Sequence, residues 1–122
     1  MNISTIEQKA RDLANDIKLS DAFIEFKEIQ EKVKKTEAHY EEINEIRRAY
    51  FEALNQETQN GVKGAVSAMQ QKYALSLAKG YVKEFLEKEQ RYCMLVQQVY
   101  DILDEAINFD IASIFEDKKV ND

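Results

Sequence analysis

The sequence predicts an all-α protein, a bundle of about five helices with a long C-terminal helix. Apolar residues recur at helical spacing along most of the 122 residues, and the chain holds no proline and only three glycines. With 33% charged and 44% hydrophobic residues, the composition is that of a globular protein rather than a collagen-like or low-complexity chain. We expect a single domain, residues 1–122, because this length suffices for one hydrophobic core.

The first two predicted helices cover residues 4–18 and 20–35. Ser4 and Glu7 have the spacing of a capping box, in which each side chain bonds to the backbone of the other residue. Ser20-Asp21 is placed to cap the second helix, because a serine or aspartate oxygen can accept from an unpaired amide of the first turn. The expected apolar positions of the two helices are Ile6, Ala10, Leu13, Ala14 and Ile17, then Phe23, Phe26, Ile29 or Gln30, and Val33.

A third helix is predicted over residues 37–58, with Thr36 as its cap. Its apolar face would consist of Tyr40, Ile43, Ile46, Tyr50, Phe51 and Leu54. Gly61 and Gly64 then indicate a chain break, because glycine tolerates the left-handed backbone that ends helices. A fourth helix is expected over residues 65–78.

Gly80 indicates another boundary, and the fifth helix is predicted over residues 81–107, a length of about 40 Å. Eleven of the sixteen residues from Tyr92 to Ile107 are apolar, which is more than one packed face requires. The helix is therefore either central in its own bundle or packed on another chain, and we favour a homodimer or a higher oligomer. Residues 116–122 are expected to fray, after a short apolar return at Ile111, Ile114 and Phe115.

One carboxylate falls on the apolar seam of this long helix. Glu89 lies seven residues after Val82 and seven before Val96, where a charge needs a partner. Arg47 is placed similarly on the third helix, among apolar residues. We expect a structural ion pair between Arg47 and Glu89 rather than a catalytic carboxylate.

No catalytic or metal-binding constellation can be assembled from these residues. His39 is the only histidine, and we expect it to be an exposed or partly buried residue in the first turn of its helix. Cys93 is the only cysteine and cannot hold zinc or an iron–sulfur cluster within one chain, so a small buried hydrophobic residue is expected there. We therefore predict no metal and no cofactor.

The net charge, the short apolar runs and the N-terminal residues restrict the expected partners and compartment. The net charge is −6, and the basic residues near Lys34 and Arg47 are interleaved with glutamates, so no direct binding of nucleic acid is expected. The longest apolar run, Tyr92 to Val96, is five residues, far too short to span a membrane. The N-terminus lacks the features of a signal peptide, and a single cysteine is compatible with a reducing compartment, so we expect a cytoplasmic protein.

Three stretches of the chain resemble the YlbF/YmcA family of small bacterial helical proteins, the competence regulators. The most specific stretch is Glu89-Gln90-Arg91, with the residues before it from Phe85 and the apolar run after it to Ile107. The segment from Asp12 to Lys27 is similar to the first two helices of the family, and that from Ile43 to Gly61 is similar to its third helix and the turn that follows. The resemblance covers about residues 6–115.

The resemblance implies a cytoplasmic helical protein that self-associates and acts without catalysis. Family members influence competence, sporulation and biofilm formation, and they assemble with related proteins and modulate ribonuclease Y. Some members carry iron–sulfur clusters on cysteines, a pattern from which this chain departs. By this resemblance and the excess of apolar residues on the long helix, the expected interface residues are Glu89, Gln90, Arg91, Tyr92, Met94, Leu95, Val99 and Ile102.

The sequence thus favours a regulatory adaptor that binds proteins through helix faces. Two other classes stay open. A small helical enzyme with an active site between subunits would need several converging cations, and the chain has four arginines. A direct RNA-binding protein would show a steep dependence of affinity on salt.

Overall fold

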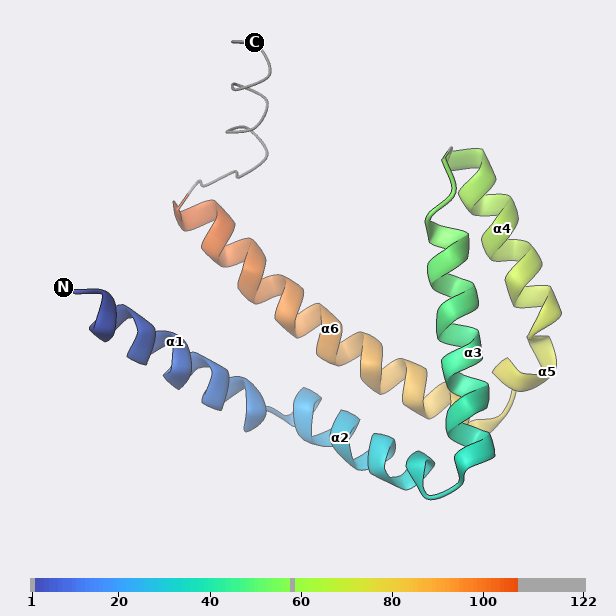
Figure 1. Cartoon of the computed structure of the whole chain (residues 1–122), viewed down its shortest axis with the longest axis horizontal. Helices are drawn as coiled ribbons and strands as arrows, with labels where there is room; N and C mark the ends of the chain where they lie inside the picture. The colour runs from blue at the N-terminus through green and yellow to red at the C-terminus, as the bar shows by residue number, and fades with distance from the viewer. Residues whose placement is uncertain (1, 58, 108–122) are drawn as a thin grey trace, which may run out of the picture.

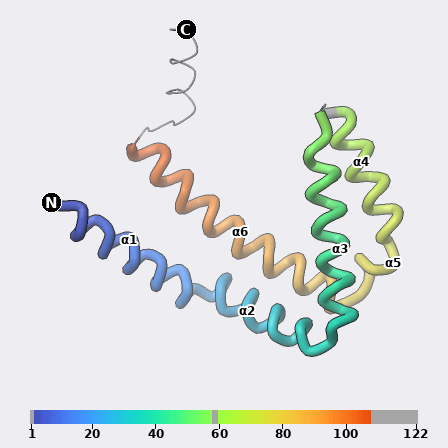
Figure 2. Tube along the Cα trace, in the orientation of Figure 1, coloured from blue at the N-terminus to red at the C-terminus, as the bar shows by residue number. Residues whose placement is uncertain are grey.

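The computed structural model describes residues 2–57 and 59–107, and every regular element among them is an α-helix (Figures 1 and 2). The predicted all-α fold with a long C-terminal helix is confirmed. The described residues form one helix more than expected, in the order α1 (Ile3–Lys18), α2 (Asp21–Lys34), α3 (Glu37–Leu54), α4 (Gln59–Lys72), α5 (Ala74–Leu77) and α6 (Gly80–Ile107).

The helices form two groups that share the beginning of α6. Helices α3 and α4 form an antiparallel pair at one end of the molecule, and α2 packs along the first half of α6 (Figure 1). Helix α1 continues beyond α2 and extends toward the same end of the molecule as the second half of α6, and these two segments diverge (Figure 2). The bundle is therefore closed at one end and open at the other.

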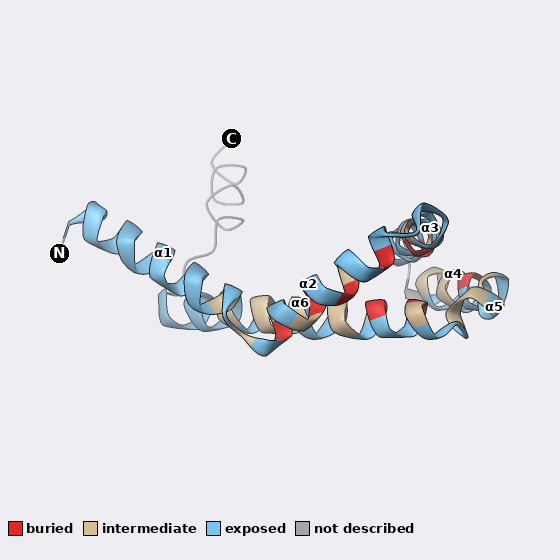
Figure 3. Ribbon diagram, turned by 90° about the horizontal axis from the view of Figure 1, so that it is seen from below, coloured by how far each residue is buried: buried red, intermediate tan, exposed pale blue. Residues whose placement is uncertain are grey.

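The hydrophobic core lies where α2, α3 and the first half of α6 meet. Phe85, Ile43 and Val82 are fully enclosed there, and the ring of Phe26 meets that of Phe85 edge to face with centroids 5.5 Å apart. Figure 3 shows the same distribution, because buried residues are confined to the closed end. No residue of α1 is buried, so packing at this end supplies most of the stability.

Of the three predicted helix caps, the one at Ser20 is confirmed, the one at Thr36 is confirmed in position only, and the one at Ser4 is wrong. Ser20 caps α2 and accepts from the Phe23 amide at 3.3 Å. Thr36 occupies the N-cap position of α3, although its side chain makes no capping bond. Asn2, rather than Ser4, caps α1, because the Asn2 carboxamide oxygen accepts from the Thr5 amide at 3.0 Å.

The chain break predicted at Gly61 and Gly64 is wrong. Helix α4 begins at Gln59 and continues through Gly61 and Gly64, so the polar turn before it, rather than glycine, separates α3 from α4. Helix α3 ends at Leu54 instead of residue 58, because the Asn55 side-chain amide donates to the Phe51 carbonyl at 2.8 Å and satisfies the last turn.

The predicted helix over residues 65–78 is two helices, α4 and α5, separated at Tyr73. The boundary expected near Gly80 is confirmed, because α6 begins at that residue and ends at Ile107. The expected apolar return at 111–115 and the frayed tail at 116–122 lie outside the described residues. No described helix is long and apolar enough to cross a membrane.

Candidate functional site

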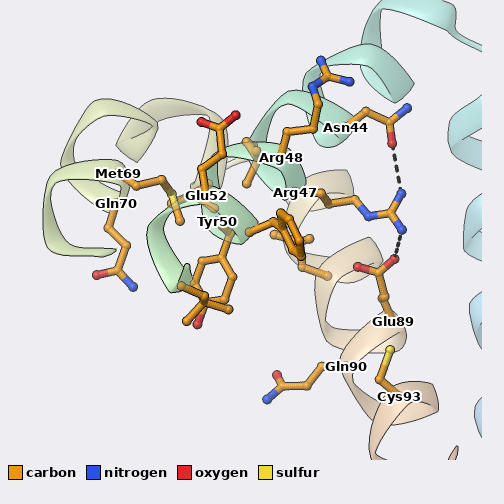
Figure 4. A pocket seen from close by; sticks show the side chains of 15 residues that line it. Asn44, Arg47, Arg48, Tyr50, Glu52, Met69, Gln70, Glu89, Gln90 and Cys93 are labelled. Carbon is orange, nitrogen blue, oxygen red and sulfur yellow. Dashed lines mark hydrogen bonds and ion pairs between the residues drawn. The ribbon is translucent and has the colours of Figure 1, made fainter. Parts of the chain in front are cut away.

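A groove of about 800 Å³ opens between α3, α4 and the first half of α6 (Figure 4). Three neighbouring turns of α3 supply one wall, where Tyr50, Phe51 and Leu54 are exposed to solvent, Phe51 by 68%. Met69 from α4 and Leu86 from α6 line the other sides. Polar groups lie among these apolar ones, namely Asn44, Arg47, Arg48, Glu52, Gln70, Glu89 and Gln90.

The predicted partners Arg47 and Glu89 meet at the edge of this groove. The Arg47 Nη2 atom lies 2.7 Å from the Glu89 Oε2 atom, and Arg47 Nη1 donates to the Asn44 carboxamide oxygen at 3.0 Å (Figure 4). The Arg47 guanidinium also lies over the Phe85 ring, 5.6 Å from its centroid. The pair therefore joins α3 to α6 across the top of the core.

The environment of Glu89 is partly desolvated, since its side chain is 20% exposed. Burial raises the pKa of Glu89 above its usual value, and the neighbouring Arg47 cation acts in the opposite direction. A raised pKa in a groove is typical of functional sites, but an ion pair between helices produces it as well.

Cys93 lies one helical turn after Glu89 and also lines the groove (Figure 4). The expectation of a buried hydrophobic residue is wrong, because Cys93 is exposed. The physical reason is the groove itself: α3 and α4 leave this face of α6 open to solvent. Gln90, predicted as an interface residue, is exposed on the same side of the helix.

A second polar centre, which sequence reasoning missed, holds α3 to the start of α6. The Glu42 carboxylate accepts from the Ser76 hydroxyl at 2.8 Å, from the Lys79 ammonium at 2.9 Å and from the Tyr81 hydroxyl. These bonds, above all that from Tyr81, lower the pKa of Glu42 to about 2, and they raise the pKa values of Lys79 and Tyr81. No spacing in the sequence distinguishes Glu42 from the other glutamates of α3.

His39 belongs to the neighbourhood of this second centre. Its ring stacks on that of Tyr81 with centroids 4.1 Å apart, and it remains exposed in the first turn of α3, as predicted. His39 is not among the residues that line the groove. Among the described residues, no group of three or more histidine, cysteine, aspartate or glutamate side chains is placed to hold a metal ion.

Besides Glu89, which is paired with Arg47, two more predicted interface residues are engaged within the chain. The Arg91 guanidinium and the Lys88 ammonium both donate to the Glu25 carboxylate of α2. The ring of Tyr92 stacks on that of Phe26, with centroids 5.7 Å apart. Arg91 and Tyr92 therefore fasten α2 to α6, and any role at an interface would come in addition to this one.

The other predicted interface residues lie toward the open end of the molecule. Met94 and Ile102 are exposed, and Leu95 and Val99 are partly buried. Their role in an interface stays a prediction.

The groove can bind an apolar surface with polar groups at its margin, since apolar side chains supply its walls and α3, α4 and α6 each supply a side-chain amide. No curated protein and no solved structure matches the chain. A family model described as control of competence regulator ComK, YlbF/YmcA, matches residues 6–108. The match spans all six helices except the first turn of α1, and the chain belongs to the YlbF/YmcA family.

Proposed function

We propose that this protein is a non-catalytic, cytoplasmic regulatory adaptor that self-associates and binds an amphipathic helix of a protein partner in the groove between α3, α4 and α6. The family description, control of a competence regulator, supports the regulatory part of this proposal. Related helical proteins and ribonuclease Y, which the family resemblance suggests, are the first partners to test. Competence, sporulation and biofilm formation are the processes in which an effect is expected.

The observation that carries the proposal is the exposed apolar wall of the groove. Tyr50, Phe51 and Leu54 lie on one side of α3 and are exposed, although each could contribute to a core. Aromatic residues near the centre of an apolar patch with a polar margin are typical of the positions that dominate the energy of protein binding. A partner helix would present apolar residues at helical spacing to this wall.

The charges of the groove support binding rather than catalysis. An enzyme for anionic substrates would need several free cations that converge on one point, whereas one of the two arginines that line the groove, Arg47, is already paired with Glu89 at 2.7 Å. The Glu89 carboxylate is engaged in the same pair. The two groups therefore stabilise the groove and leave the apolar wall as its principal binding feature.

Cys93 allows a direct test, because it is exposed, lines the groove and is the only cysteine of the chain. An environment-sensitive dye attached to Cys93 should change its emission when the labelled protein is titrated with purified ribonuclease Y or with related family members. A matched control carries the dye at position 75, in a Leu75→Cys, Cys93→Ser protein. Leu75 is 88% exposed on α5 and does not line the groove.

Substitution of the wall provides the second arm of the experiment. Phe51→Ala should weaken partner binding about tenfold or more, whereas Leu75→Ala should leave the affinity unchanged. An equal loss in both variants, or no response of the Cys93 dye to any of these partners, would contradict the proposal. Affinity that falls steeply with salt and is lost on nuclease treatment would instead indicate direct RNA binding.

A further inference from the structure

The Glu89 carboxylate has one oxygen that no donor of the chain satisfies. Its Oε2 atom pairs with Arg47 at 2.7 Å, and no bond among the described residues reaches Oε1. Figure 4 shows this second oxygen on the side of the carboxylate that faces the groove. Among the described residues, no side-chain oxygen without a partner is fully enclosed, so Oε1 is open to the groove.

The other glutamates that join helices in the described part of the chain have more donors. Glu25 accepts from two cations of α6, and Glu42 accepts from three side chains at or near the start of α6. Glu89 has a single donor, although its side chain is less exposed than that of Glu25, 20% against 36%. The unsatisfied oxygen is therefore particular to the carboxylate that lines the groove.

The side chains around the groove cannot supply the second donor. The Arg47 guanidinium is held between Glu89, Asn44 and the Phe85 ring. Arg48 also lines the groove, but it points away from Glu89 (Figure 4). The lining residues of α4, α5 and α6 include no basic side chain. A second donor must therefore come from whatever occupies the groove.

A helix bound in the groove would remove the remaining water from Glu89, and a charged group buried without enough partners is costly. Burial already raises the pKa of Glu89 in spite of the Arg47 cation, so one cation does not offset the desolvation. A second cation would offset it, whereas a carboxylate at the same place would be repelled. The net charge of −6 also attracts a basic segment over a longer distance.

We propose that the helix bound in the groove is basic and amphipathic, and that one of its lysine or arginine side chains donates to Oε1 of Glu89. This proposal rests on the function proposed above and adds the chemical class of the partner. The apolar wall of α3 supplies affinity, and Glu89 selects among apolar helices by rejecting those with a neutral or acidic residue at this place.

Disulfide exchange at Cys93 tests the proposal, because Cys93 lines the groove one helical turn after Glu89. The probes are synthetic helical peptides with an apolar stripe of leucines and a central cysteine. Each carries lysine, glutamine or glutamate one turn before or after that cysteine, so that either direction of binding is covered. The tether holds the peptide at a millimolar effective concentration.

Mass spectrometry measures the fraction of peptide adduct at equilibrium in a fixed glutathione buffer. The better of the two lysine peptides should form its adduct about fivefold more favourably than the matching glutamine peptide, and the glutamate peptide should be the poorest. Glu89→Gln should remove the preference for lysine and leave the adduct of the glutamine peptide unchanged. Circular dichroism verifies that this variant keeps its helices.

A second tether separates Glu89 from the overall charge of the chain. In the Leu75→Cys, Cys93→Ser protein the cysteine lies outside the groove, and no preference for lysine is expected. A preference that appears there, or that survives Glu89→Gln, would refute the inference.

The Phe51→Ala variant separates this inference from the proposed function. If the groove binds helices, Phe51→Ala should lower the adduct of every peptide at Cys93. Adducts that respond to Phe51→Ala but show no preference for lysine would refute the role of Glu89 alone. Adducts that ignore Phe51→Ala and are as frequent at position 75 as at position 93 would refute helix binding in the groove as well.

Discussion

The ion pair between Arg47 and Glu89 allows a quantitative test of how α3 is fixed to α6. The perturbation is a double-mutant cycle with Arg47→Met and Glu89→Gln, which remove each charge and keep most of the side-chain volume. The pair is close, 2.7 Å between Nη2 and Oε2, and its two side chains are 39% and 20% exposed. It lies between a surface ion pair and a fully buried one.

This intermediate position sets the expected coupling energy. Exposed pairs contribute about 0.2–1 kcal/mol, and hydrogen bonds to charged groups contribute about 1.5–3 kcal/mol. We therefore expect a coupling of about 1–2 kcal/mol. Glu89→Gln alone should cost less than a broken buried pair usually does, because Arg47 keeps its bond to Asn44 and can reach water.

Urea unfolding followed by circular dichroism measures the four free energies of unfolding at pH 7 and one protein concentration, since the proposed self-association would make stability depend on concentration. The coupling should fall as salt increases. It should also disappear as the pH falls through the pKa of Glu89, which burial raises. A coupling below about 0.3 kcal/mol, within the usual error of additivity, would refute the argument that this pair joins α3 to α6.

Three further predictions concern the core, the second polar centre and a helix interior. Phe85→Ala should lower the free energy of unfolding by about 3–5 kcal/mol, because this ring is fully enclosed, whereas Leu75→Ala should change it by less than about 0.5 kcal/mol; urea unfolding compares the two. The lowered pKa of Glu42, about 2, means that its stabilisation is complete above the unfolded value near 4.5 and is lost as the pH falls from there toward 2. Allowing for screening at a partly exposed carboxylate, Glu42→Gln should remove about 1–2 kcal/mol at pH 7 and flatten the acid limb of a stability-against-pH curve. Gly64→Ala should raise the free energy of unfolding by about 0.5–1 kcal/mol, since an added Cβ meets nothing within 4 Å in α4, and a lower melting temperature would contradict this.

Glu89 should have the opposite pH dependence to Glu42. Because the pKa of Glu89 is raised in the folded chain, its protonation favours folding, so its contribution to stability grows as the pH falls through that pKa. Glu89→Gln removes this gain, and the acid loss caused by Glu42 should then be steeper than in the wild type.

Much of the fold could be predicted from the sequence, because it depends on local patterns. Helical periodicity without proline determines the all-α class, and Ser20 caps α2 as its position predicted. The meeting of Arg47 with Glu89 was also predictable, since a charge on an apolar seam requires a partner. Each of these inferences depends on chemistry within one helix or on a single burial argument.

The failures depended on tertiary structure. Gly61 and Gly64 fall inside α4, where packing against α3 outweighs a propensity cost of about 1 kcal/mol per glycine. Cys93 lies on the apolar stripe of α6, yet it is exposed, because α3 and α4 stop short of it. The stripe alone does not reveal this. Glu42 could not be found at all, since its partners come from residues 34 to 39 positions away.

The apolar excess of α6 is the feature that joins these observations. The sequence presents a single stripe from Val82 to Ile107, whereas the structure divides it into three parts: a core covered by α2 and α3, the groove beside Cys93, and the last turns of the helix, where Tyr100, Leu103 and Ile107 are exposed. The last two parts are exposed on different portions of the helix, so two partners can occupy them at once. Phe51→Ala should therefore weaken partner binding about tenfold or more and spare self-association, whereas Leu103→Glu should weaken self-association and spare partner binding. Loss of both activities in either variant would mean that the groove and the last turns of α6 bind as a single surface.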